Sequence, residues 1–444
     1  MELPRLNTHA SLISGISPAE LLGLYEQYRQ ELISIKKKVN DPKVLLVEAN
    51  LIHFVAAFFA AVETGVAIFL GNPNWGAQEW AQVAEDLKPD LIWGDENLWG
   101  HFSSVRLPDV ATRSGYIHIP TGGSSGKVRF AIHNWRTLSA SAQATLSLFG
   151  ENPLNACNVL PLYHVSGLMP IVRAFISKGH VLFLELKDDL PALEEDVYVL
   201  SLVGKQLKDL LGKPEAVSWL RSFRAVFLGG GPTAASLLSE ARKQNIPVGL
   251  TYGMTETASM VSLSMPDTFL SGNNSLGQQL PGMDLAITNS QGGSLSAGQS
   301  GRIQVCSESL FYGYYPQVPE FRDVLKTSDS GFMNKTGDLF VQGRVDTLII
   351  SGGEKVAPWE VEAAIMSSGE VSGVHILGQK DSQWGECVVA IYESEFVLSE
   401  EKLKIFLKER LAPYKIPKKW IRVPEVPLDE KGKLDKKALE ALLS

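Results

Sequence analysis

The sequence predicts an α/β protein with a large N-terminal domain and a small α+β C-terminal domain. Three observations support this fold class. The chain has 444 residues, which is too long for one ordinary hydrophobic core. Up to about residue 277, apolar runs alternate with helix-like segments, a pattern typical of βαβ units with mostly parallel sheets. After that point, short Gly- and Ser-rich segments predict an antiparallel, β-barrel-like subdomain.

The alternation can be followed along the N-terminal part. The strand-like runs are KVLLVEA (43–49), VAIFL (66–70), DLIWG (90–94), NACNVLPL (155–162), HVLFLEL (180–186) and RAVFLGGG (224–231). The helix-like segments between and after them cover residues 54–65, 77–90, 169–179 and 236–245. Because strands and helices alternate, we expect consecutive strands to run parallel.

The pattern changes again near residues 343–346. Helices are expected at residues 358–369 and 399–411, and strands at 373–379 and 387–393. We therefore predict two domains, comprising residues 1–343 and 344–444.

The charge of the chain limits its partners. The net charge is -8 and the pI is near 5.6, which argues against a nucleic acid or an anionic membrane as the main partner. The distribution is uneven, because residues 401–444 carry 12 Lys and Arg against 7 Asp and Glu. This basic end could meet a polyanionic ligand or could simply be a solvated helix face.

The three cysteines, Cys157, Cys306 and Cys387, are far apart and form no CxxC pair. They predict neither a disulfide framework nor a zinc site, and they fit a reducing compartment. No basic segment followed by an apolar run opens the chain, so no signal peptide is expected. The longest apolar stretch, residues 54–70, is too short and interrupted for a membrane span. We expect a cytoplasmic protein.

The stretch YIHIPTGGSSGKVRF (116–130) is the first candidate for chemistry. A Walker phosphate loop does not fit, because Gly122 and Gly126 are too close and Val128 follows Lys127. Residues 122–126 also read G-x-S-x-G, which would make Ser124 a nucleophile. That motif requires a helix directly after the turn. Residues 127–133 instead read as a strand, so Ser124 is expected in a hairpin loop.

A third interpretation is a looser phosphate cradle. Glycines allow backbone N–H groups to approach phosphate oxygens, hydroxyl groups add donors, and basic side chains add positive charge. The residues of this predicted cradle are Thr121, Gly122, Gly123, Ser124, Ser125, Gly126, Lys127 and Arg129.

Four further motifs follow in order. They are LGGGPTA (228–234), TYGMTET (251–257), the segment KTGDLFVQGRVDTLIISGGEKVAPWEVE (335–362) and PLDEKGKLDKKAL (427–439). Together with TGGSSGKVR, they resemble the ANL superfamily of adenylate-forming enzymes, which contains acyl-CoA synthetases, adenylation domains and luciferases. The resemblance implies a two-step reaction. A carboxylate and ATP give an acyl-adenylate and pyrophosphate, a thiol such as that of coenzyme A displaces AMP, and the C-terminal domain rotates between the steps.

The resemblance also implies roles for residues of the ATP site. Glu256 is expected to bind Mg²⁺, which prefers oxygen ligands, and Thr255 to bond a phosphate. Tyr252 is expected to lie along the adenine ring. The remaining ATP-binding residues that these motifs imply are Gly229, Gly230, Gly231, Gly253 and Met254.

Further roles fall on the last two motifs. Asp338 is expected to hold the ribose hydroxyl groups with the help of Arg344, and Asp346 matches the hinge position. Lys433 resembles the lysine that bridges the substrate carboxylate and the α-phosphate, where a cation relieves the repulsion of two anions. One departure is clear: Val128-Arg129-Phe130 replaces the usual Pro-Lys-Gly, so loop motion or ATP affinity is expected to differ.

The acid substrate is indicated by LPLYHVSGLMPIVRAF (160–175), in which Arg173 interrupts an apolar helix. A buried arginine is costly unless it meets an anion, although an arginine at a helix end can also reach solvent. His164, Ser166, Gly167 and Arg173 resemble the branch of the superfamily that ligates o-succinylbenzoate, an aromatic dicarboxylate, to coenzyme A in menaquinone and phylloquinone synthesis.

The expected partners are therefore the dicarboxylate, ATP with Mg²⁺, and coenzyme A, for which residues 351–356 and Trp384 are candidate contacts. Three alternatives stay open. They are another aryl- or acyl-CoA ligase, a serine hydrolase built on Ser124, and a nucleotide-binding protein without turnover.

Overall fold

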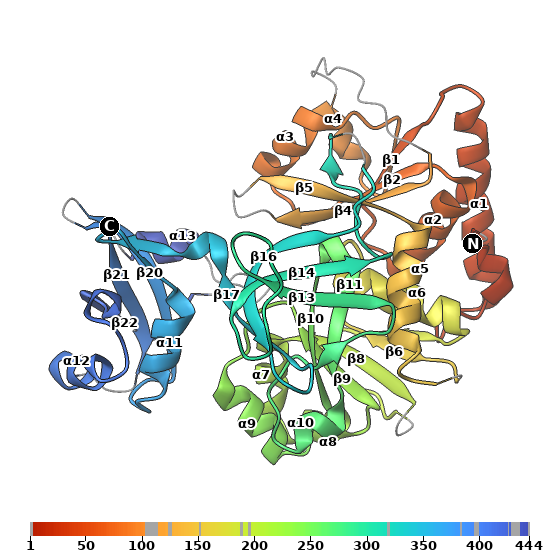
Figure 1. The fold of residues 1–444 in the computed structure, drawn as a ribbon. Coiled ribbons are helices and arrows are strands. Elements are labelled where there is room, and N and C mark those ends of the chain that lie inside the picture. Colours follow the sequence, from red (N-terminus) through yellow and green to blue (C-terminus); the bar gives the residue numbers. More distant parts are fainter. Residues whose placement is uncertain are drawn as a thin grey trace.

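The computed structural model describes residues 3–102, 114–122, 127–150, 152–186, 190–193, 197–317, 320–381, 384–394, 399–424, 426–427 and 436–442. Within these residues the strands form four sheets, which are arranged in a large N-terminal part and a smaller C-terminal part (Figure 1). None of the helices described in these ranges is long and apolar enough to cross a membrane.

The first sheet has six strands in the order β15-β5-β4-β2-β1-β3. Its strands are β1 (Lys43–Leu46), β2 (Ala67–Leu70), β3 (Leu91–Trp93), β4 (Tyr116–Gly122), β5 (Val128–Asn134) and β15 (Tyr314–Tyr315). The strands β1 to β4 run parallel, whereas β5 and β15 are antiparallel to their neighbours. The mostly parallel βαβ arrangement expected from the alternating pattern is therefore confirmed.

The second sheet has seven strands in the order β12-β11-β10-β9-β8-β6-β7. They are β6 (Asn155–Asn158), β7 (Val181–Phe183), β8 (Tyr198–Val203), β9 (Ala225–Gly229), β10 (Val248–Met254), β11 (Ser259–Ser264) and β12 (Gln278–Gln279). The strands β6 to β10 are parallel, and β11 and β12 add antiparallel edges.

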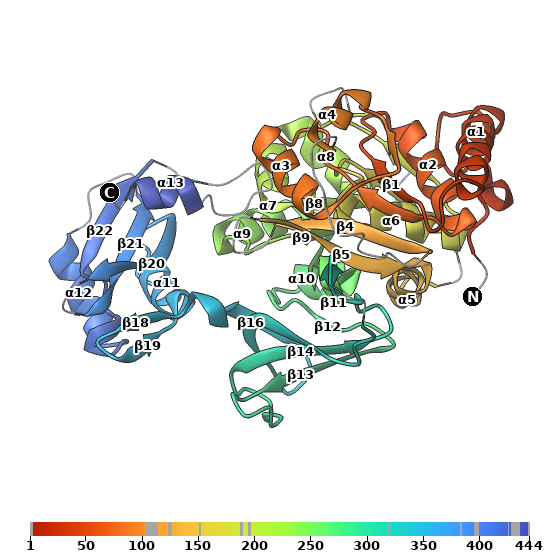
Figure 2. The ribbon, with the colours of Figure 1, turned by 90° about the horizontal axis from the view of Figure 1, so that it is seen from above.

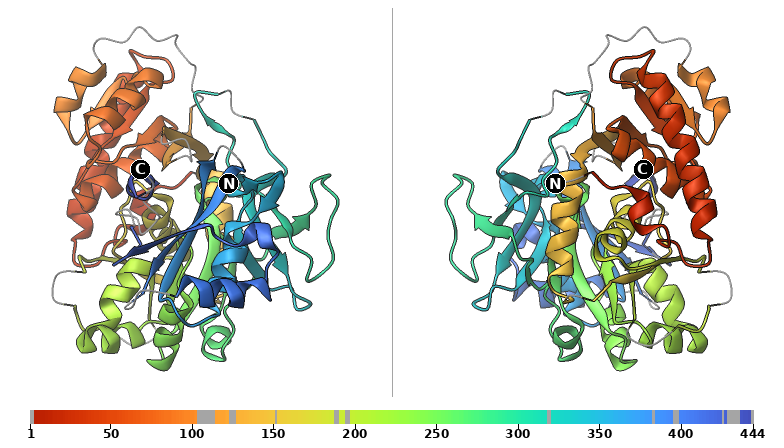
Figure 3. Two further views of the ribbon diagram at one scale, coloured as in Figure 1. Left: turned by 90° about the vertical axis from the view of Figure 1, so that its left-hand side faces the viewer. Right: turned by 90° about the vertical axis from the view of Figure 1, so that its right-hand side faces the viewer.

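Helices cover both sheets. They are α1 (Pro18–Lys36), α2 (Leu51–Thr64), α3 (Ala77–Asp86), α4 (Trp99–Phe102), α5 (Trp135–Leu146), α6 (Val165–Ser177), α7 (Gly204–Leu211), α8 (Pro214–Arg221), α9 (Ala235–Lys243) and α10 (Pro266–Leu270). Short 3-10 turns lie at η1 (Leu6–His9), η2 (Glu96–Leu98) and η3 (Thr255–Thr257). The helix α1 packs on α2 and runs along the outer edge of the molecule (Figure 3).

Local sequence explains where α2 begins and ends. The side chain of Asn50 accepts hydrogen bonds from the N–H groups of Ile52 and His53 and so caps the first turn. Gly65 ends the helix with a φ of 67°, a left-handed conformation that glycine adopts without strain. Between these caps the side chains of residues 54–62 are all buried, so the middle of α2 lies in the first hydrophobic core.

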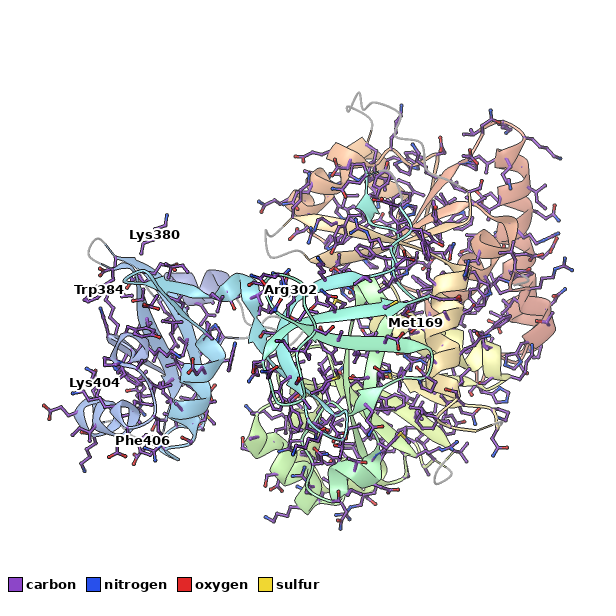
Figure 4. All side chains as sticks on the ribbon, viewed as in Figure 1. Met169, Arg302, Lys380, Trp384, Lys404 and Phe406 are labelled. Carbon is purple, nitrogen blue, oxygen red and sulfur yellow. The ribbon has the colours of Figure 1, made fainter. Side chains whose placement is uncertain are left out.

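The helices α5 and α6 pack against each other between the first two sheets (Figure 1). Asn134 caps α5 by accepting a hydrogen bond from the N–H of Thr137 at 3.0 Å. The helix α6 is apolar along most of its length, and Met169 lies in the interior of the protein (Figure 4). These two helices therefore connect the cores of the two sheets.

An antiparallel sheet follows residue 277, as expected. Its strands, β13 (Met283–Thr288), β14 (Gly301–Ser307), β16 (Leu325–Met333) and β17 (Leu339–Arg344), pair in the open order β13-β14-β16-β17. Figure 2 shows this sheet below the two larger ones.

The C-terminal part has its own five-stranded sheet and its own cores. It contains β18 (Ile349–Ser351), β19 (Glu354–Val356), β20 (Gly373–Asp381), β21 (Gly385–Glu393) and β22 (Lys419–Val423), with η4 (Val345–Thr347), η5 (Pro413–Lys415), α11 (Pro358–Met366), α12 (Glu400–Lys408) and α13 (Lys436–Ala441). The predicted domain boundary, between residues 343 and 344, falls inside β17, just before its last residue. A Cβ atom at Gly343 would lie only 2.1 Å from Cδ1 of Trp359, so this junction requires a residue without a side chain.

Two fully buried histidines lie on the hairpin of β4 and β5. His118 stacks on Phe69 and its Nδ1 lies 3.1 Å from the carbonyl oxygen of Ile68. Burial lowers the pKa of His118 from 6.5 to about 3, and burial lowers the pKa of His133 to about 4. Both side chains are therefore neutral in the folded protein at neutral pH.

We expect acidification to destabilise the N-terminal part through these histidines. The unfolded chain binds protons near pH 6.5 and the folded chain does not, so the stabilisation is present above pH 6.5 and is lost as the pH falls toward 4 and 3. Between pH 6.5 and 5 each histidine should cost roughly 2 kcal/mol of unfolding free energy. Urea unfolding at pH 7 and pH 5 measures the loss, and His118→Phe should reduce it. An equal loss in the wild type and the variant would contradict this prediction.

Candidate active site

The glycine-rich stretch connects two antiparallel strands. Thr121 pairs with Arg129 and Gly122 with Val128, and β5 continues to Asn134. A strand therefore follows the loop, as expected, and the strand–turn–helix geometry of a serine nucleophile is not present around it. Gly123, Ser124, Ser125 and Gly126 themselves lie outside the described residues.

The two basic residues after the loop have different surroundings. The ammonium nitrogen of Lys127 lies 3.2 Å from carboxylate oxygens of both Glu85 and Asp86 on α3, and hydrogen bonds to Asp86 and Glu85 raise its pKa. The guanidinium of Arg129 instead lies 4.2 Å from the centre of the Tyr314 ring, and its Nε is buried without a hydrogen-bond partner. Arg129 thus has a free donor in the interior of the protein, while Lys127 is bound to α3.

Thr255 and Glu256 form the turn η3 between β10 and β11. The hydroxyl of Tyr314 donates to Oε1 of Glu256, and the N–H of Phe311 donates to the carbonyl oxygen of Glu256 at 2.9 Å. Burial and the Glu256 carboxylate raise the pKa of Tyr314, so the phenol keeps its proton. Through Tyr314, Glu256 is joined to the strand that Arg129 belongs to.

The carboxylate side chains of the site decide which metal ion it could bind. No group of three or more His, Cys, Asp or Glu side chains that could hold a metal occurs within the part of the chain that the structure describes. Glu256 supplies one carboxylate beside the hydroxyl-bearing Thr255. Such a set fits Mg²⁺, which is commonly held by one or two carboxylates together with substrate phosphates.

The LGGG segment ends β9 and allows close approach of the backbone. A Cβ atom at Gly229 would lie 2.5 Å from Oγ1 of Thr251 on the neighbouring strand β10. Gly230 has a φ of 90°, which residues with side chains rarely adopt. Gly231 has open space around it. The segment thus presents bare backbone beside β10, which carries Tyr252, Gly253 and Met254.

Tyr252 contacts a carboxylate that the sequence analysis did not identify. Its buried hydroxyl donates to Oδ2 of Asp329 at 2.7 Å, and Nη1 of Arg344 lies 3.8 Å from Oδ1 of the same side chain. Asp329 and Arg344 are direct partners in the pairing of β16 with β17. The structure therefore brings Tyr252, Asp329 and Arg344 together.

Asp338, which is predicted to act with Arg344, does not contact this group. It lies in the turn beyond the other end of β17, where Asn334 donates to its carboxylate at 2.9 Å and Thr336 at 2.7 Å. These hydrogen bonds, above all that of Thr336, lower the pKa of Asp338. Six residues of extended chain separate Asp338 from Arg344, which corresponds to about 20 Å.

A sequence signal for Asp329 was present. Residues 326–329 read KTSD, which repeats the KTGD pattern of residues 335–338 with Ser in place of Gly. Residues 335–338 match the TGD motif more closely, because Gly337 stands where residues 326–329 have Ser328.

Arg173 lies inside the protein on α6, with 3% of its surface exposed. Its Nη2 donates to Oγ of Ser259 at 3.2 Å, the Phe227 ring is 5.9 Å away, and its Nε has no hydrogen-bond partner. Burial lowers the pKa of Arg173 to about 10, so it stays charged at neutral pH. Across the described ranges no carboxylate forms an ion pair with it. The alternative of a helix-end arginine reaching solvent is thus wrong.

His164, Ser166 and Gly167 lie at the start of α6. His164 is the N-cap residue, and its ring lies 4.6 Å from that of Tyr163. A Cβ atom at Gly167 would lie 2.3 Å from the carbonyl oxygen of Pro161, so glycine is needed for the helix to pack on the preceding loop. Ser166 is exposed. These residues therefore share a helix with Arg173.

The remaining predicted residues belong to the C-terminal part. Lys433 lies outside the described residues, and Asp346 lies in η4, with its side chain outside them. Trp384 is 38% exposed, and Nζ of Lys418 lies 3.1 Å from the centre of its ring. Figure 4 shows Trp384 on the C-terminal part, far from Met169 of α6.

Comparison with known proteins identifies relatives over the whole chain. The family AMP-binding enzyme matches residues 103–315, and the AMP-binding enzyme C-terminal domain matches residues 360–433. The 2-succinylbenzoate–CoA ligase of Bacillus licheniformis is 32% identical, covering 96% of this chain and 95% of that protein. The ligase of the same name from Bacillus cytotoxicus is 32% identical over 93% of this chain and 90% of its own.

Solved structures with the same fold cover nearly the whole chain. The o-succinylbenzoate CoA synthetase of Bacillus subtilis, in complex with the acyl-adenylate intermediate OSB-AMP, has a TM-score of 0.77 at 24% identity, covering 99% of this chain and 98% of that one. The ATP-bound MatB of Rhodopseudomonas palustris has a TM-score of 0.77 at 22% identity, covering 96% and 93%. The similarity includes the N-terminal third, where the sequence carries few motifs. The chain therefore belongs to the family of AMP-binding enzymes.

Proposed function

We propose that this protein is an ATP- and CoA-dependent ligase that converts 2-succinylbenzoate (o-succinylbenzoate) to 2-succinylbenzoyl-CoA. A substrate carboxylate oxygen bonds to the α-phosphorus of ATP as the bond to pyrophosphate breaks. The sulfur of coenzyme A, after loss of its proton, then bonds to the acyl carbon as AMP leaves. The product would serve menaquinone or phylloquinone synthesis. The relatives named 2-succinylbenzoate–CoA ligase support this assignment.

The observation that carries the proposal is the buried charge of Arg173. A charged guanidinium inside a protein is costly without an anionic partner, and Nε of Arg173 lacks any hydrogen bond. A monocarboxylic acid would use its only carboxylate in the reaction. A dicarboxylate leaves a second carboxylate free to pair with Arg173, which favours 2-succinylbenzoate over benzoate or a fatty acid.

We assign the ATP side of the site to the hairpin, the η3 turn, the second sheet and the antiparallel sheet of β13, β14, β16 and β17. Arg129 and the hairpin loop would bind phosphates, with Thr255. Glu256 would hold Mg²⁺, which neutralises phosphate charge when bound. Tyr252 would lie along the adenine, opposite the bare backbone of residues 229–231.

For the ribose we propose Asp329, with Arg344, in place of Asp338. Asp329 is the acceptor of the Tyr252 hydroxyl and the strand partner of Arg344. Asp338 is already bonded by its own turn.

The C-terminal part completes the proposal. We assign the adenylation role to Lys433, the hinge to Asp346 and the domain boundary to residues 343 and 344. The separate sheet and cores beyond residue 348 support this division. Residues 351–356 and Trp384 remain the candidates for contact with coenzyme A. A cytoplasmic location fits the three free cysteines.

The substrate proposal predicts the behaviour of Arg173→Met. Pyrophosphate release should be strongest with 2-succinylbenzoate, compared with benzoate, a medium-chain fatty acid and an amino acid. The variant should lose about 2 kcal/mol or more of substrate binding, which is roughly 30-fold in KM. Its thermal unfolding temperature should not fall, because methionine removes a buried, unpaired charge.

Arg224→Met provides the matched control. Arg224 donates to the carbonyl oxygen of Phe149 at 2.8 Å and lies over its ring, so its loss should lower stability and leave the KM for the acid unchanged. If benzoate drove pyrophosphate release as strongly as 2-succinylbenzoate, and Arg173→Met did not change this, the proposed substrate would be contradicted. The proposed adenylate-forming reaction would not be.

The ribose assignment predicts opposite results for two Asp→Asn variants. Asp329→Asn should raise the KM for ATP roughly 10- to 100-fold, because hydrogen bonds to a charged group are worth about 1.5–3 kcal/mol. Asp338→Asn should lower the unfolding temperature and leave the KM for ATP nearly unchanged, because it weakens only the hydrogen bonds of the turn at residues 334–338. Steady-state kinetics with varied ATP and thermal unfolding measure both effects. If Asp338→Asn raised the KM for ATP more than Asp329→Asn does, the ribose role would return to Asp338.

A further inference from the structure

A buried polar face joins the glycine hairpin to the turn that carries Glu256. His133 is the last residue but one of β5, and Thr137 and Ser141 follow at intervals of four residues on α5. This spacing places Thr137 and Ser141 on one face of α5, and His133 precedes them on the strand. All three are almost completely buried, with exposures of 0%, 2% and 0%. Because buried polar groups need hydrogen bonds, this face must be matched by polar groups opposite it.

The groups opposite are backbone carbonyls of the turn. Nε2 of His133 lies 2.8 Å from the carbonyl oxygen of Thr255, and Oγ of Ser141 donates to the carbonyl oxygen of Ala258 at 2.6 Å. Nδ1 of His133 lies 2.9 Å from Oγ1 of Thr137. A carbonyl oxygen only accepts, so Nε2 must carry the proton. Since burial keeps His133 neutral, Nδ1 accepts from Thr137.

The turn that these bonds hold is strained. Ala258 has a φ of 52° and Ser259 a φ of 103°, conformations that residues with a Cβ atom rarely adopt. Such strain persists only where the surroundings fix the backbone. Within five residues the turn carries Glu256, which faces Tyr314, and Ser259, which accepts a hydrogen bond from Arg173. A shift of this turn would therefore move groups on both the ATP side and the acid side.

We propose that His133 is a positioning residue which, with Thr137 and Ser141, fixes the turn at residues 255–259 so that Glu256 and Ser259 face the substrates. It acts through backbone carbonyls and touches no reacting atom. Because His133 belongs to β5, it also fixes the turn relative to Arg129 on the same strand. This inference rests on the proposed function for its substrates but is tested by nucleotide binding alone.

The test compares three variants of buried histidines. His133→Phe keeps the ring and removes the donor to Thr255. His133→Gln retains an N–H group at a similar reach. His118→Phe is the matched control, because His118 is equally buried on the adjacent strand and bonds the carbonyl oxygen of Ile68, away from the turn. Calorimetric binding of ATP with Mg²⁺ and thermal unfolding are measured for each.

We expect His133→Phe to weaken binding of ATP with Mg²⁺ roughly 10- to 100-fold, as removal of an outer partner of a metal ligand commonly does. His133→Gln should restore most of the binding. His118→Phe should lower the unfolding temperature and leave the binding unchanged. Equal losses of binding in His133→Phe and His118→Phe, or no rescue by glutamine, would overturn the proposal.

Two smaller substitutions on α5 test the proposal if His133→Phe does not fold. Ser141→Ala removes the bond to Ala258, whereas Ser139→Ala removes a buried hydroxyl that has no hydrogen-bond partner. Only Ser141→Ala should weaken nucleotide binding, and equal binding by both variants would overturn the proposal.

Wild-type pyrophosphate release with 2-succinylbenzoate separates the two proposals. Its absence, together with weakened nucleotide binding in His133→Phe, would reject the proposed substrate and retain the role of His133.

Discussion

Two hydrogen bonds from the β5–α5 segment to the η3–β11 turn connect the halves of the large domain. His133 and Ser141 bond carbonyls of Thr255 and Ala258, residues more than a hundred positions away in the chain. On one side lies the sheet with the glycine hairpin, and on the other the sheet with the LGGG segment and Tyr252. A site made from both sheets depends on this junction, because neither sheet alone brings Arg129, Glu256 and Arg173 close to the same turn.

Arg173, in contrast to these hydrogen bonds, lowers the stability of the protein. Its charge is buried against apolar neighbours with one hydrogen bond to a serine, so it destabilises the protein in the absence of an anion. Natural proteins tolerate such groups where binding needs them. The apolar core that α2, α5 and α6 share contributes stability that offsets this cost.

The sequence predicted much of the fold because its local patterns are consistent. The β-run after Lys127 distinguished a hairpin loop from a nucleophile elbow, and the lone arginine in an apolar helix indicated a buried charge. It could not distinguish Asp329 from Asp338, since both follow a K-T-x pattern nine residues apart. Only the pairing of β16 with β17 shows which aspartate faces Arg344. The proposed role of His133 could not be predicted either, because no sequence pattern around His133 or Thr255 indicates a hydrogen bond between them.

The contact between Gly343 and Trp359 has an optical consequence. The indole ring occupies the space that a side chain at residue 343 would fill, directly beside the proposed hinge. A rotation of the C-terminal part about that hinge would carry the ring away from the strand backbone and into water. Indole emission depends on the polarity around the ring, so the protein would contain its own fluorescent reporter of domain orientation.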